Sequence, residues 1–279
     1  MLETRQYKLN GRNVIASIVS DVGCVREANE DSGLHTNPND SVIQKNRGTL
    51  TIVADGMGGH ASGEVASQMA IELISEFYYA DTESPTVDAL RNAIQQANAE
   101  IFATSESDEK YYGMGTTLIT LVLLEDSAIA AHVGDSRLYR LRNKNLELLT
   151  MDHSQVMEMV KLGVLSMEEA RNHEDKNVIL RAVGTQPKVE IEITPEFKVE
   201  TNDEFLLCSD GLTDMLSDQE IHYIWANAED VHQASENLIN KAKENGGHDN
   251  VTVAIVKIED GIMSDRVAPV TREWRAYTK

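Results

Sequence analysis

The segment TIVADGMGGHASGEVASQM, residues 51–69, leads from a run of apolar residues into Asp55 and then into four glycines within residues 56–63. A glycine-rich turn before a helix can cradle a phosphate, whereas a carboxylate at the end of a strand can hold a metal ion. The segment contains no lysine and no Gly-Lys-Ser/Thr, which a phosphate loop needs for its cation. Its glycines also fail to fit GxGxxG, because the third glycine position falls on Ala61. The residues therefore favour a metal site over a phosphate loop.

The composition limits the size and the class of the protein. With 279 residues, of which 41% are hydrophobic, the chain can form one large domain or two small ones with a real core. The 46 acidic residues outnumber the 25 basic ones and give a formal net charge of −21. Such a charge repels nucleic acids and anionic membranes at long range, so neither is expected as a partner. Most of the acidic residues are expected to solubilise the surface, and a minority can form a metal site.

Neither a signal peptide nor a membrane span is predicted. The N-terminal residues MLETRQYKLN contain no apolar core. The longest apolar runs, such as LITLVLL at 118–124, are too short to cross a bilayer. The two cysteines, Cys24 and Cys208, lack the spacing of a zinc site and are predicted to be free thiols in the core. Free thiols suit a reducing cytosol, so a cytoplasmic protein is expected.

Short apolar segments bounded by turn residues predict eight strands. They are residues 14–20, 50–54, 117–124, 128–133, 137–141, 189–193, 203–208 and 251–258. Apolar residues spaced by three and four predict helices at 64–79, 86–104 and 231–244. The strands do not alternate one-for-one with helices, and those within 117–141 predict an antiparallel meander. This order favours an α+β layered sandwich over a doubly wound parallel sheet.

Two segments depart from this pattern of strands and helices. Residues 152–182 are polar and prone to form helices, which predicts a small helical insertion between strands. Residues 261–279 lack a clear apolar period. We therefore expect one domain at residues 1–260, followed by a mobile C-terminal tail at 261–279.

Carboxylates recur beside glycines at the ends of the predicted strands. The positions are Asp55-Gly56, Gly134-Asp135, Asp210-Gly211, Asp249-Asn250 just before a strand, and Arg26, Glu30 and Asp31 after the first strand. If the strands pack side by side, their ends meet at one rim. Several carboxylates at one rim cannot all stay ionised unless cations neutralise them. Oxygen ligands without a matching His/Cys set indicate Mg²⁺ or Mn²⁺ rather than zinc.

Seven motifs follow one another along the chain. They are SDVGCVREANEDS (20–32), VADGMGGHASGEVAS (53–67), MGTTL (114–118), HVGDSRLY (132–139), DHS (152–154), LLCSDGLTD (206–214) and GGHDNVTV (246–253). The ordered set resembles the metal-dependent serine/threonine protein phosphatases of the protein phosphatase 2C (PP2C, PPM) family in their compact bacterial form. The resemblance covers roughly residues 14–258. It implies a four-layer αββα sandwich, in which helices flank two antiparallel β-sheets and the metals lie in a cleft at one edge.

The resemblance implies two core metal ions, Mn²⁺ or Mg²⁺, and a set of residues that hold them. Asp55 corresponds to the carboxylate that bridges both ions, and Gly56 to a carbonyl ligand. Asp210 and Asp249 correspond to further ligands. The implied reaction is hydrolysis of phosphoserine and phosphothreonine by direct attack of a hydroxide that bridges the two metals, without a covalent intermediate. The predicted catalytic residues are therefore Asp55, Asp210 and Arg26.

The same resemblance implies roles for residues around the two ions. Glu30 and Asp31 correspond to positions that act largely through bound waters. Asp135 corresponds to a residue that helps to hold a third, weaker metal ion. Arg26 corresponds to the arginine that grips the substrate phosphate, for which a planar bidentate fork is suited. Asn250 is expected to orient its neighbour from behind the metal ligands.

The general acid for the leaving group stays open. Many eukaryotic members have a histidine directly after the Asp-Gly pair, where this chain has Met57. His60 in the GGH pattern and His153 in DHS are candidates, as is a water held by a metal ion. His60 is equally well explained as a turn residue behind the metal ligands, and His153 as a loop anchor.

The resemblance also implies partners for the protein. Phosphorylated proteins are the expected substrates, a bacterial eukaryotic-like Ser/Thr kinase is the enzyme it opposes, and the protein is expected to be a monomer. The insertion at 152–182 matches the family's flap and is expected to contribute to substrate choice and to the third metal. A non-catalytic regulatory or binding module on the same scaffold is disfavoured because no metal carboxylate is missing. A hydrolase of nucleotides or phospholipids is disfavoured because a base-binding signature and an apolar membrane face are lacking.

Overall fold

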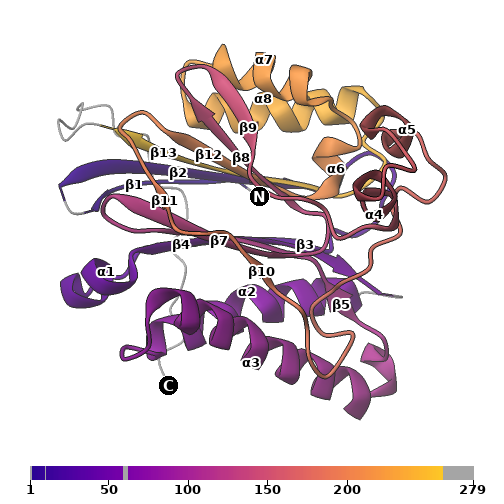
Figure 1. The fold of residues 1–279 in the computed structure, drawn as a ribbon, viewed down its shortest axis with the longest axis horizontal. Coiled ribbons are helices and arrows are strands. Elements are labelled where there is room, and N and C mark those ends of the chain that lie inside the picture. Colours follow the sequence, from indigo (N-terminus) through magenta and orange to yellow (C-terminus); the bar gives the residue numbers. More distant parts are fainter. Residues whose placement is uncertain (1, 10, 59–61, 260–279) are drawn as a thin grey trace.

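Two antiparallel sheets lie face to face in the computed structural model, which describes residues 2–9, 11–58 and 62–259. Figure 1 shows helices on the outer face of each sheet, so four layers follow in the order helix, sheet, sheet, helix. All strand pairs within the described residues are antiparallel. The predicted α+β class and αββα sandwich are therefore confirmed. The tail predicted at 261–279 lies outside the described residues.

The first sheet has six strands in the order β1-β2-β13-β12-β8-β9. They are β1 (Leu2–Leu9), β2 (Arg12–Asp21), β13 (Val251–Glu259), β12 (Glu204–Cys208), β8 (Arg137–Arg142) and β9 (Asn145–Leu148). Two helices cover its outer face, α7 (Asp218–Ala226) and α8 (Val231–Glu244). β13 pairs with both β2 and β12, so motifs near residues 20, 210 and 250 come together at the end of this sheet.

The second sheet has the order β10-β7-β6-β4-β3, with β11 paired to β7 and β5 paired to β4. Its strands are β10 (Glu192–Ile193), β7 (Ser127–Val133), β6 (Leu118–Leu123), β4 (Thr49–Met57), β3 (Asp31–Thr36), β11 (Phe197–Lys198) and β5 (Gly115–Thr116). The helices beside it are α1 (Ser41–Arg47), α2 (Ser62–Ala80), α3 (Thr86–Ser107) and the 3₁₀ turn η1 (Glu109–Tyr111). Three short helices lie elsewhere, α4 (Gln155–Lys161), α5 (Met167–Arg171) and α6 (Asp210–Thr213).

Strand β4 is buried on both faces, as expected for a strand inside a layered sandwich. Leu50, Ile52 and Ala54 belong to the core between this sheet and the helices α2 and α3. Val53 points to the opposite side and belongs to the core between the two sheets. Because both faces are apolar, the strand reads as a continuous apolar run rather than an alternating one. Among the described residues, no helix has the length and apolar composition needed to cross a bilayer.

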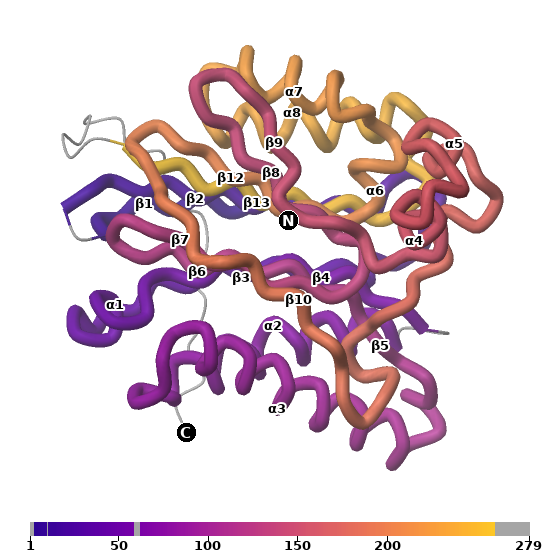
Figure 2. The backbone as a smooth tube through the Cα atoms, in the orientation of Figure 1, coloured from indigo at the N-terminus to yellow at the C-terminus, as the bar shows by residue number. Residues whose placement is uncertain are grey.

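The antiparallel meander predicted within 117–141 is wrong at its last strand. β6 and β7 pair with each other, but β8 lies in the other sheet between β12 and β9. Figures 1 and 2 show β7 in one layer and β8 in the layer above it. The chain changes sheets at Gly134 and Asp135. The sequence did not predict this change, because the strands on both sides have similar apolar patterns and only the glycine turn indicates it. This crossing brings Asp135 to the edge between the sheets.

Other predictions differ from the structure in detail. The predicted strand at 189–193 shortens to β10, while β1, β3 and β9 were not predicted. β3 has the polar sequence DSGLHT, which lacks the apolar signal of a strand. Cys208 is buried as predicted, but Cys24 is exposed in the loop after β2, so its assignment to the core is wrong.

Candidate metal centre

Asp31 and Asp55 lie opposite each other on neighbouring strands. β3 begins at Asp31, and the antiparallel register pairs this residue with Asp55 of β4. Asp31 is buried, and its Oδ2 accepts a hydrogen bond of 2.7 Å from Ser209 Oγ. The half-buried Asp55 carboxyl lies close enough to Asp31 and Asp210 that the charge of each raises its pKa. Three carboxyl groups from three segments of the sequence therefore meet at one point.

The MGTTL motif holds the backbone of Asp55. The Asp55 N–H donates to Thr117 Oγ1 at 3.1 Å, and the Thr117 N–H donates to the Asp55 carbonyl at 2.8 Å. The Thr116 hydroxyl donates to the same carbonyl at 2.8 Å. The sequence alone indicates no role for this motif, since none of its side chains is a common metal ligand. Its contribution is to fix the backbone from which the Asp55 carboxylate extends.

Gly56 occupies a place where no other residue fits. A Cβ at this position would lie 2.1 Å from the Gly63 carbonyl oxygen and 2.6 Å from that of Glu30. The strand also continues through Gly56 to Met57, which pairs with β5, although the sequence predicted its end at residue 54. The glycines thus allow the start of α2 to pack directly against the strand that carries Asp55.

Asp210 and Asp249 reach the same rim from the first sheet. Asp210 begins α6, two residues after the end of β12, and Asp249 lies two residues before β13. β12 and β13 are hydrogen-bonded neighbours, so the two aspartates approach from adjacent strand ends. The Oδ1 atom of Asp210 is buried and has no hydrogen-bond partner among the described residues. The same holds for Oδ1 of Asp31.

Asn250 fixes the loop that carries Glu30. Its side-chain amide donates to the carbonyls of Val22 at 3.0 Å and Ala28 at 2.9 Å. Its Oδ1 accepts from the Glu30 N–H at 2.8 Å, and its own backbone N–H donates to Asp249 Oδ1 at 2.8 Å. Asn250 therefore touches its neighbour through the backbone, while its side chain supports the loop between β2 and β3.

Arg26 lies on the exposed side of the acidic rim, which is the group of carboxylates formed by Asp31, Asp55, Asp210 and Asp249. Its side chain is 52% exposed, and Nη2 donates a hydrogen bond of 2.7 Å to Asp249 Oδ2. This bond raises the pKa of Arg26, so the guanidinium stays charged. An accessible guanidinium beside a row of carboxylates can bind an anion that cations also hold.

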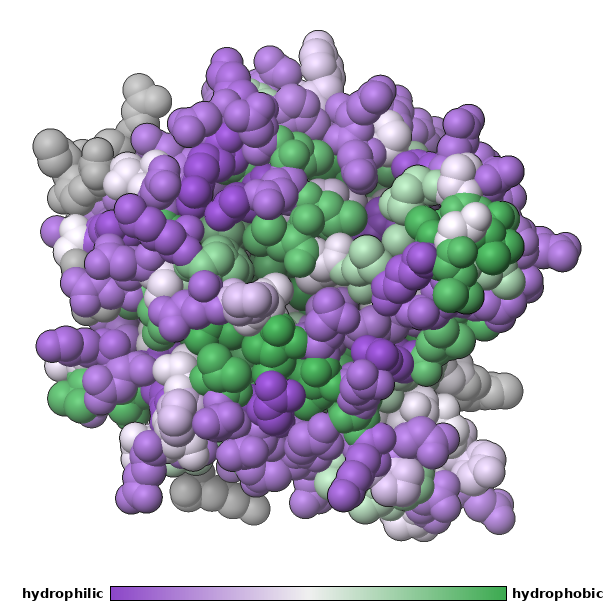
Figure 3. Space-filling model, viewed as in Figure 1, coloured by the Kyte–Doolittle hydropathy of each residue, from purple (hydrophilic) through white to green (hydrophobic). Residues whose placement is uncertain are grey.

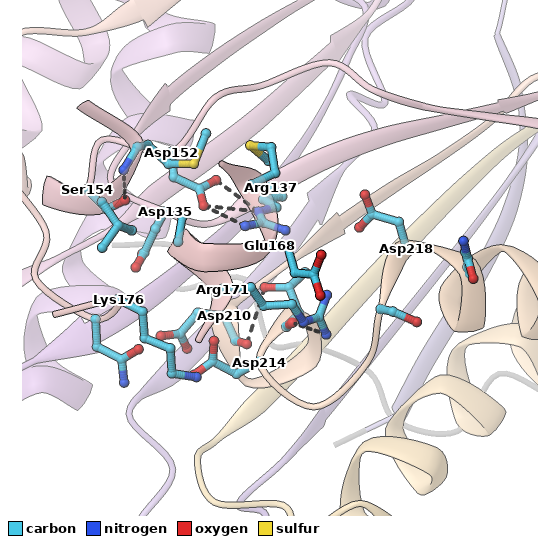
Figure 4. A pocket seen from close by; sticks show the side chains of 18 residues that line it. Asp135, Arg137, Asp152, Ser154, Glu168, Arg171, Lys176, Asp210, Asp214 and Asp218 are labelled. Atoms are coloured by element: carbon cyan, nitrogen blue, oxygen red, sulfur yellow. Dashed lines mark hydrogen bonds and ion pairs between the residues drawn. The ribbon is translucent and has the colours of Figure 1, made fainter. Parts of the chain in front are cut away.

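Asp135 and Asp210 border a cavity of about 570 Å³. The other side of the cavity is formed by the insertion at 152–182 and includes Glu168, Arg171 and Lys176 (Figure 4). Lys176 Nζ donates to Asp214 Oδ2 at 2.7 Å, which ties the insertion to the segment after α6. The insertion predicted from its polar sequence therefore covers a cavity that opens onto two of the candidate metal ligands.

The pKa values of the carboxyl groups show that the cluster needs a proton or a cation. Burial raises the pKa of Asp31 to about 6 and that of Asp135 to about 7. Burial and then the neighbouring carboxylates raise the pKa of Asp55 and Asp210 well above the ordinary range. The donors are all oxygen, and two of the buried oxygens have no protein partner among the described residues. This donor set fits Mg²⁺ or Mn²⁺.

Of the two histidines considered as the general acid, the structure describes only His153. His60 lies outside the described residues. His153 is 2% exposed and is hydrogen-bonded to Gly134 and to Glu192. Its neighbours Asp152 and Ser154 line the cavity, but His153 does not. These contacts agree with the loop-anchoring interpretation of His153 rather than with an acid.

The chain is similar in sequence to known phosphatases. The family model described as "Protein phosphatase 2C" matches residues 29–249. The serine/threonine phosphatase stp of Listeria monocytogenes is 40% identical over 247 residues, which cover 87% of this chain and 95% of that protein.

Solved structures agree in fold as well as in sequence. The serine/threonine phosphatase Stp1 from Staphylococcus aureus has a TM-score of 0.81 and 32% identity, covering 91% of this chain and 96% of that one. The catalytic domain of the phosphatase PstP in complex with two manganese ions has a TM-score of 0.74 and 34% identity. The match covers 88% of this chain and 99% of that one.

Proposed function

The chain belongs to the protein phosphatase 2C family and is a serine/threonine protein phosphatase, and we propose that it hydrolyses phosphoserine and phosphothreonine with divalent cations held by its acidic rim. The observation that carries this proposal is the meeting of Asp31, Asp55 and Asp210 beside the exposed Arg26. The carboxyl groups, with raised pKa values and two buried oxygens that lack a partner among the described residues, can hold the cations. The Arg26 guanidinium can bind the phosphate group.

The proposed ligands of the two core ions are Asp55, Gly56, Asp210 and Asp249. When bound, the cations supply an activated water for attack on phosphorus and neutralise negative charge on the phosphate. A PstP structure that contains two manganese ions supports Mn²⁺ as the probe ion. The protein's own part is to hold four oxygen donors from strand ends of both sheets at one point. Rigid strand ends keep such donors in place better than loops do.

Glu30, Asp31 and Asp135 have supporting roles in the proposal. Burial raises the pKa of Glu30 as well, which is consistent with a cation nearby during function. Asp31 is fixed by the Ser209 hydroxyl and acts from behind the core ligands. Asp135 is proposed to help to hold a third, weaker ion at the cavity.

Arg26 is proposed to bind the substrate phosphate. Negative charge builds up on the phosphate oxygens during hydrolysis, and a planar fork can meet two of them. A nucleophilic role of Cys208 is disfavoured because burial raises the pKa of its thiol to about 12, which leaves little thiolate at neutral pH. Direct attack of a metal-activated water on phosphorus, as proposed, forms no covalent intermediate with the protein.

The proposal is tested by phosphate release from a phosphothreonine peptide. The metal-free protein is assayed with and without Mn²⁺, and nucleoside triphosphates and phospholipids serve as competing substrates. We expect Mn²⁺-dependent release from the peptide and at least ~100-fold lower kcat/KM for the other two classes. Faster turnover of a nucleotide or a lipid would refute the assignment of the substrate class. A cognate Ser/Thr kinase, a monomeric state and a cytoplasmic location stay predictions.

The insertion is proposed to contact protein substrates through exposed apolar residues. Five of the ten large hydrophobic residues that are exposed in the described chain lie within the insertion at 152–182, and a sixth, Met151, lies directly before it. Figure 3 shows hydrophobic residues gathered over α4 and α5, at the right of the view. Met167 is 55% exposed and also lines the cavity, so the surface and the cavity are continuous. Exposed apolar residues that gather in this way commonly mark interaction sites.

Val164→Asp is expected to raise KM for a phosphoprotein about fivefold, because a lost apolar contact costs ~1 kcal/mol. Val42→Asp in α1 is the matched control, since the two valines are 66% and 65% exposed. Hydrolysis of a small aryl phosphate, which cannot reach the insertion's outer surface, should change in neither variant. Equal effects of Val164→Asp on both substrates would contradict a role in protein-substrate choice.

A further inference from the structure

Asp135 is placed by a short turn in which the chain changes sheets. β7 and β8 belong to different sheets, so residues 134–136 alone span the change. Gly134 has a φ of +101°, and a Cβ there would lie 2.8 Å from a neighbouring threonine side chain. The turn is therefore closely packed at the residue directly before the candidate ligand. A displacement of Gly134 would move Asp135 with it.

His153 holds both backbone groups of Gly134. The His153 N–H donates to the Gly134 carbonyl at 2.9 Å, and the Gly134 N–H donates to His153 Nδ1 at 3.1 Å. The His153 ring stacks on His132 with 4.5 Å between the centroids and 14° between the planes. Both histidines are almost completely buried. Stacking and hydrogen bonding together restrict the ring that supports the turn.

The bond at Nδ1 determines where the ring carries its proton. Because Nδ1 accepts from Gly134, a neutral His153 carries its proton on Nε2. This Nε2–H donates a hydrogen bond to Oε2 of Glu192, which lies 3.2 Å from Nε2. Burial and then the neighbouring His132 lower the pKa of His153, which favours the neutral ring that this arrangement needs.

His153 also joins the two ends of the insertion that covers the cavity. Its carbonyl accepts a hydrogen bond of 2.7 Å from the Leu180 N–H. The next residue, Ser154, forms an isolated β-bridge with Ile179. One residue thus contacts the Asp135 turn on one side and the base of the insertion on the other.

A metal ion is an alternative occupant of this cluster, since His132, His153 and Glu192 each offer a ligand atom within 4.8 Å of the others. Three contacts of His153 oppose a metal ion at this place. Nδ1 of His153 already accepts a hydrogen bond from the Gly134 N–H, so the neutral ring carries its proton on Nε2. A metal ion at Nε2 would have to displace this proton, which Nε2 donates to Glu192. The Arg181 guanidinium also lies 3.2 Å from Nε2, where it repels a cation. The contacts therefore fit a hydrogen-bonded support better than a metal site.

We propose that His153 is a positioning residue that couples the insertion to the third-metal ligand Asp135 through Gly134. This inference rests on the proposed function, in which Asp135 helps to hold a weaker ion. It adds that the position of the insertion and the affinity of that ion are linked in both directions. Residues that orient metal ligands from behind typically change affinity by 10–100-fold when they are replaced.

Two substitutions of His153 separate its two hydrogen bonds. In His153→Asn, the amide oxygen can take the place of Nδ1 and accept from Gly134. In His153→Gln, the amide group reaches the place of Nε2 and can bond Glu192, but the acceptor for Gly134 is lost. Mn²⁺ binding to each metal-free protein is measured by calorimetric titration and by electron paramagnetic resonance, and thermal unfolding confirms that both variants are folded.

We expect His153→Gln to weaken the third and weakest Mn²⁺ site about tenfold, while His153→Asn stays within about twofold of wild type. The two tighter sites should change in neither variant. Equal Mn²⁺ binding in the two variants, or a wild-type protein without a third site, would overturn the proposal. A wild-type protein that binds three ions but releases no phosphate would instead refute the proposed function alone.

The link from the insertion is tested at Leu180. Leu180→Pro removes the N–H that bonds the His153 carbonyl, while Leu180→Ala keeps it, and the side chain is 53% exposed in wild type. We expect the proline variant to weaken the third Mn²⁺ site severalfold and the alanine variant to leave it unchanged. Identical third-site affinities in both variants would show that the insertion does not act through His153.

Discussion

Asp210→Asn is expected to lower Mn²⁺-dependent phosphate release by at least ~1,000-fold, which corresponds to about 4 kcal/mol of transition-state stabilisation. Asp210 lies close enough to Asp55 to raise its pKa, and it lines the cavity together with Asp135. A neutral amide in its place removes a charged ligand at the point where the core ions are proposed to bind. Initial rates on a phosphothreonine peptide, measured across a range of Mn²⁺ concentrations, test the loss.

The same substitution is expected to stabilise the metal-free protein. Asp210 adds negative charge to a cluster in which burial and other carboxylates already raise pKa values. Removing one charge should raise the free energy of unfolding in chelator by about 1–3 kcal/mol, measured by urea titration. Asp126→Asn, at an ion pair where the aspartate is 72% exposed, is the matched control and should change stability by less than ~0.5 kcal/mol. Retained activity would contradict a role of Asp210 as a metal ligand. A metal-free variant less stable than wild type would contradict charge repulsion within the cluster.

Arg26→Ala is expected to lower kcat/KM by about 100-fold on both a phosphopeptide and a small aryl phosphate. Arg26 is half-exposed and reaches the rim at Asp249, so its proposed partner is the phosphate group that both substrates share. Arg26→Lys should recover only part of the loss, because an ammonium cannot donate two parallel hydrogen bonds in one plane. Steady-state kinetics on the two substrates measure the effect.

Controls separate this loss from a general electrostatic one. Arg12→Ala removes a different partly exposed arginine that pairs with Asp126, and it should leave kcat/KM unchanged. Calorimetric titration should find both core Mn²⁺ sites intact in Arg26→Ala. If Arg26→Ala lost activity only on the phosphopeptide, Arg26 would bind the peptide rather than the phosphate.

Much of the candidate site could be predicted because its candidate metal ligands lie in short, recognisable sequence motifs. Asp55 and Asp210 each follow an apolar run and precede a glycine, and this repeated signature predicts that strand ends meet at one rim. The layered sandwich followed from strands that do not alternate with helices. The structure places these aspartates together as the packing of strand ends requires.

The pairing of Asp31 with Asp55 could not be predicted, because it depends on long-range register. β3 has a polar sequence without the apolar pattern of a strand, and its pairing with β4 is decided by tertiary packing. The change of sheet after β7 has the same origin, since the strands on both sides of Gly134 look alike in sequence. The side chains of Thr117 and His153 each accept a hydrogen bond from a backbone N–H of another segment, which leaves no local signature in the sequence.

We propose that divalent cations held by the acidic rim are required for the hydrolysis. The most direct measurement titrates the metal-free protein with Mn²⁺ and records bound Mn²⁺ and phosphate release from a phosphothreonine peptide on the same samples. We expect no phosphate release without metal, a rise in release as the two core sites fill, and loss of both Mn²⁺ binding and phosphate release in Asp210→Asn. Phosphate release that persists in excess chelator, or that is independent of bound Mn²⁺, would contradict this proposal.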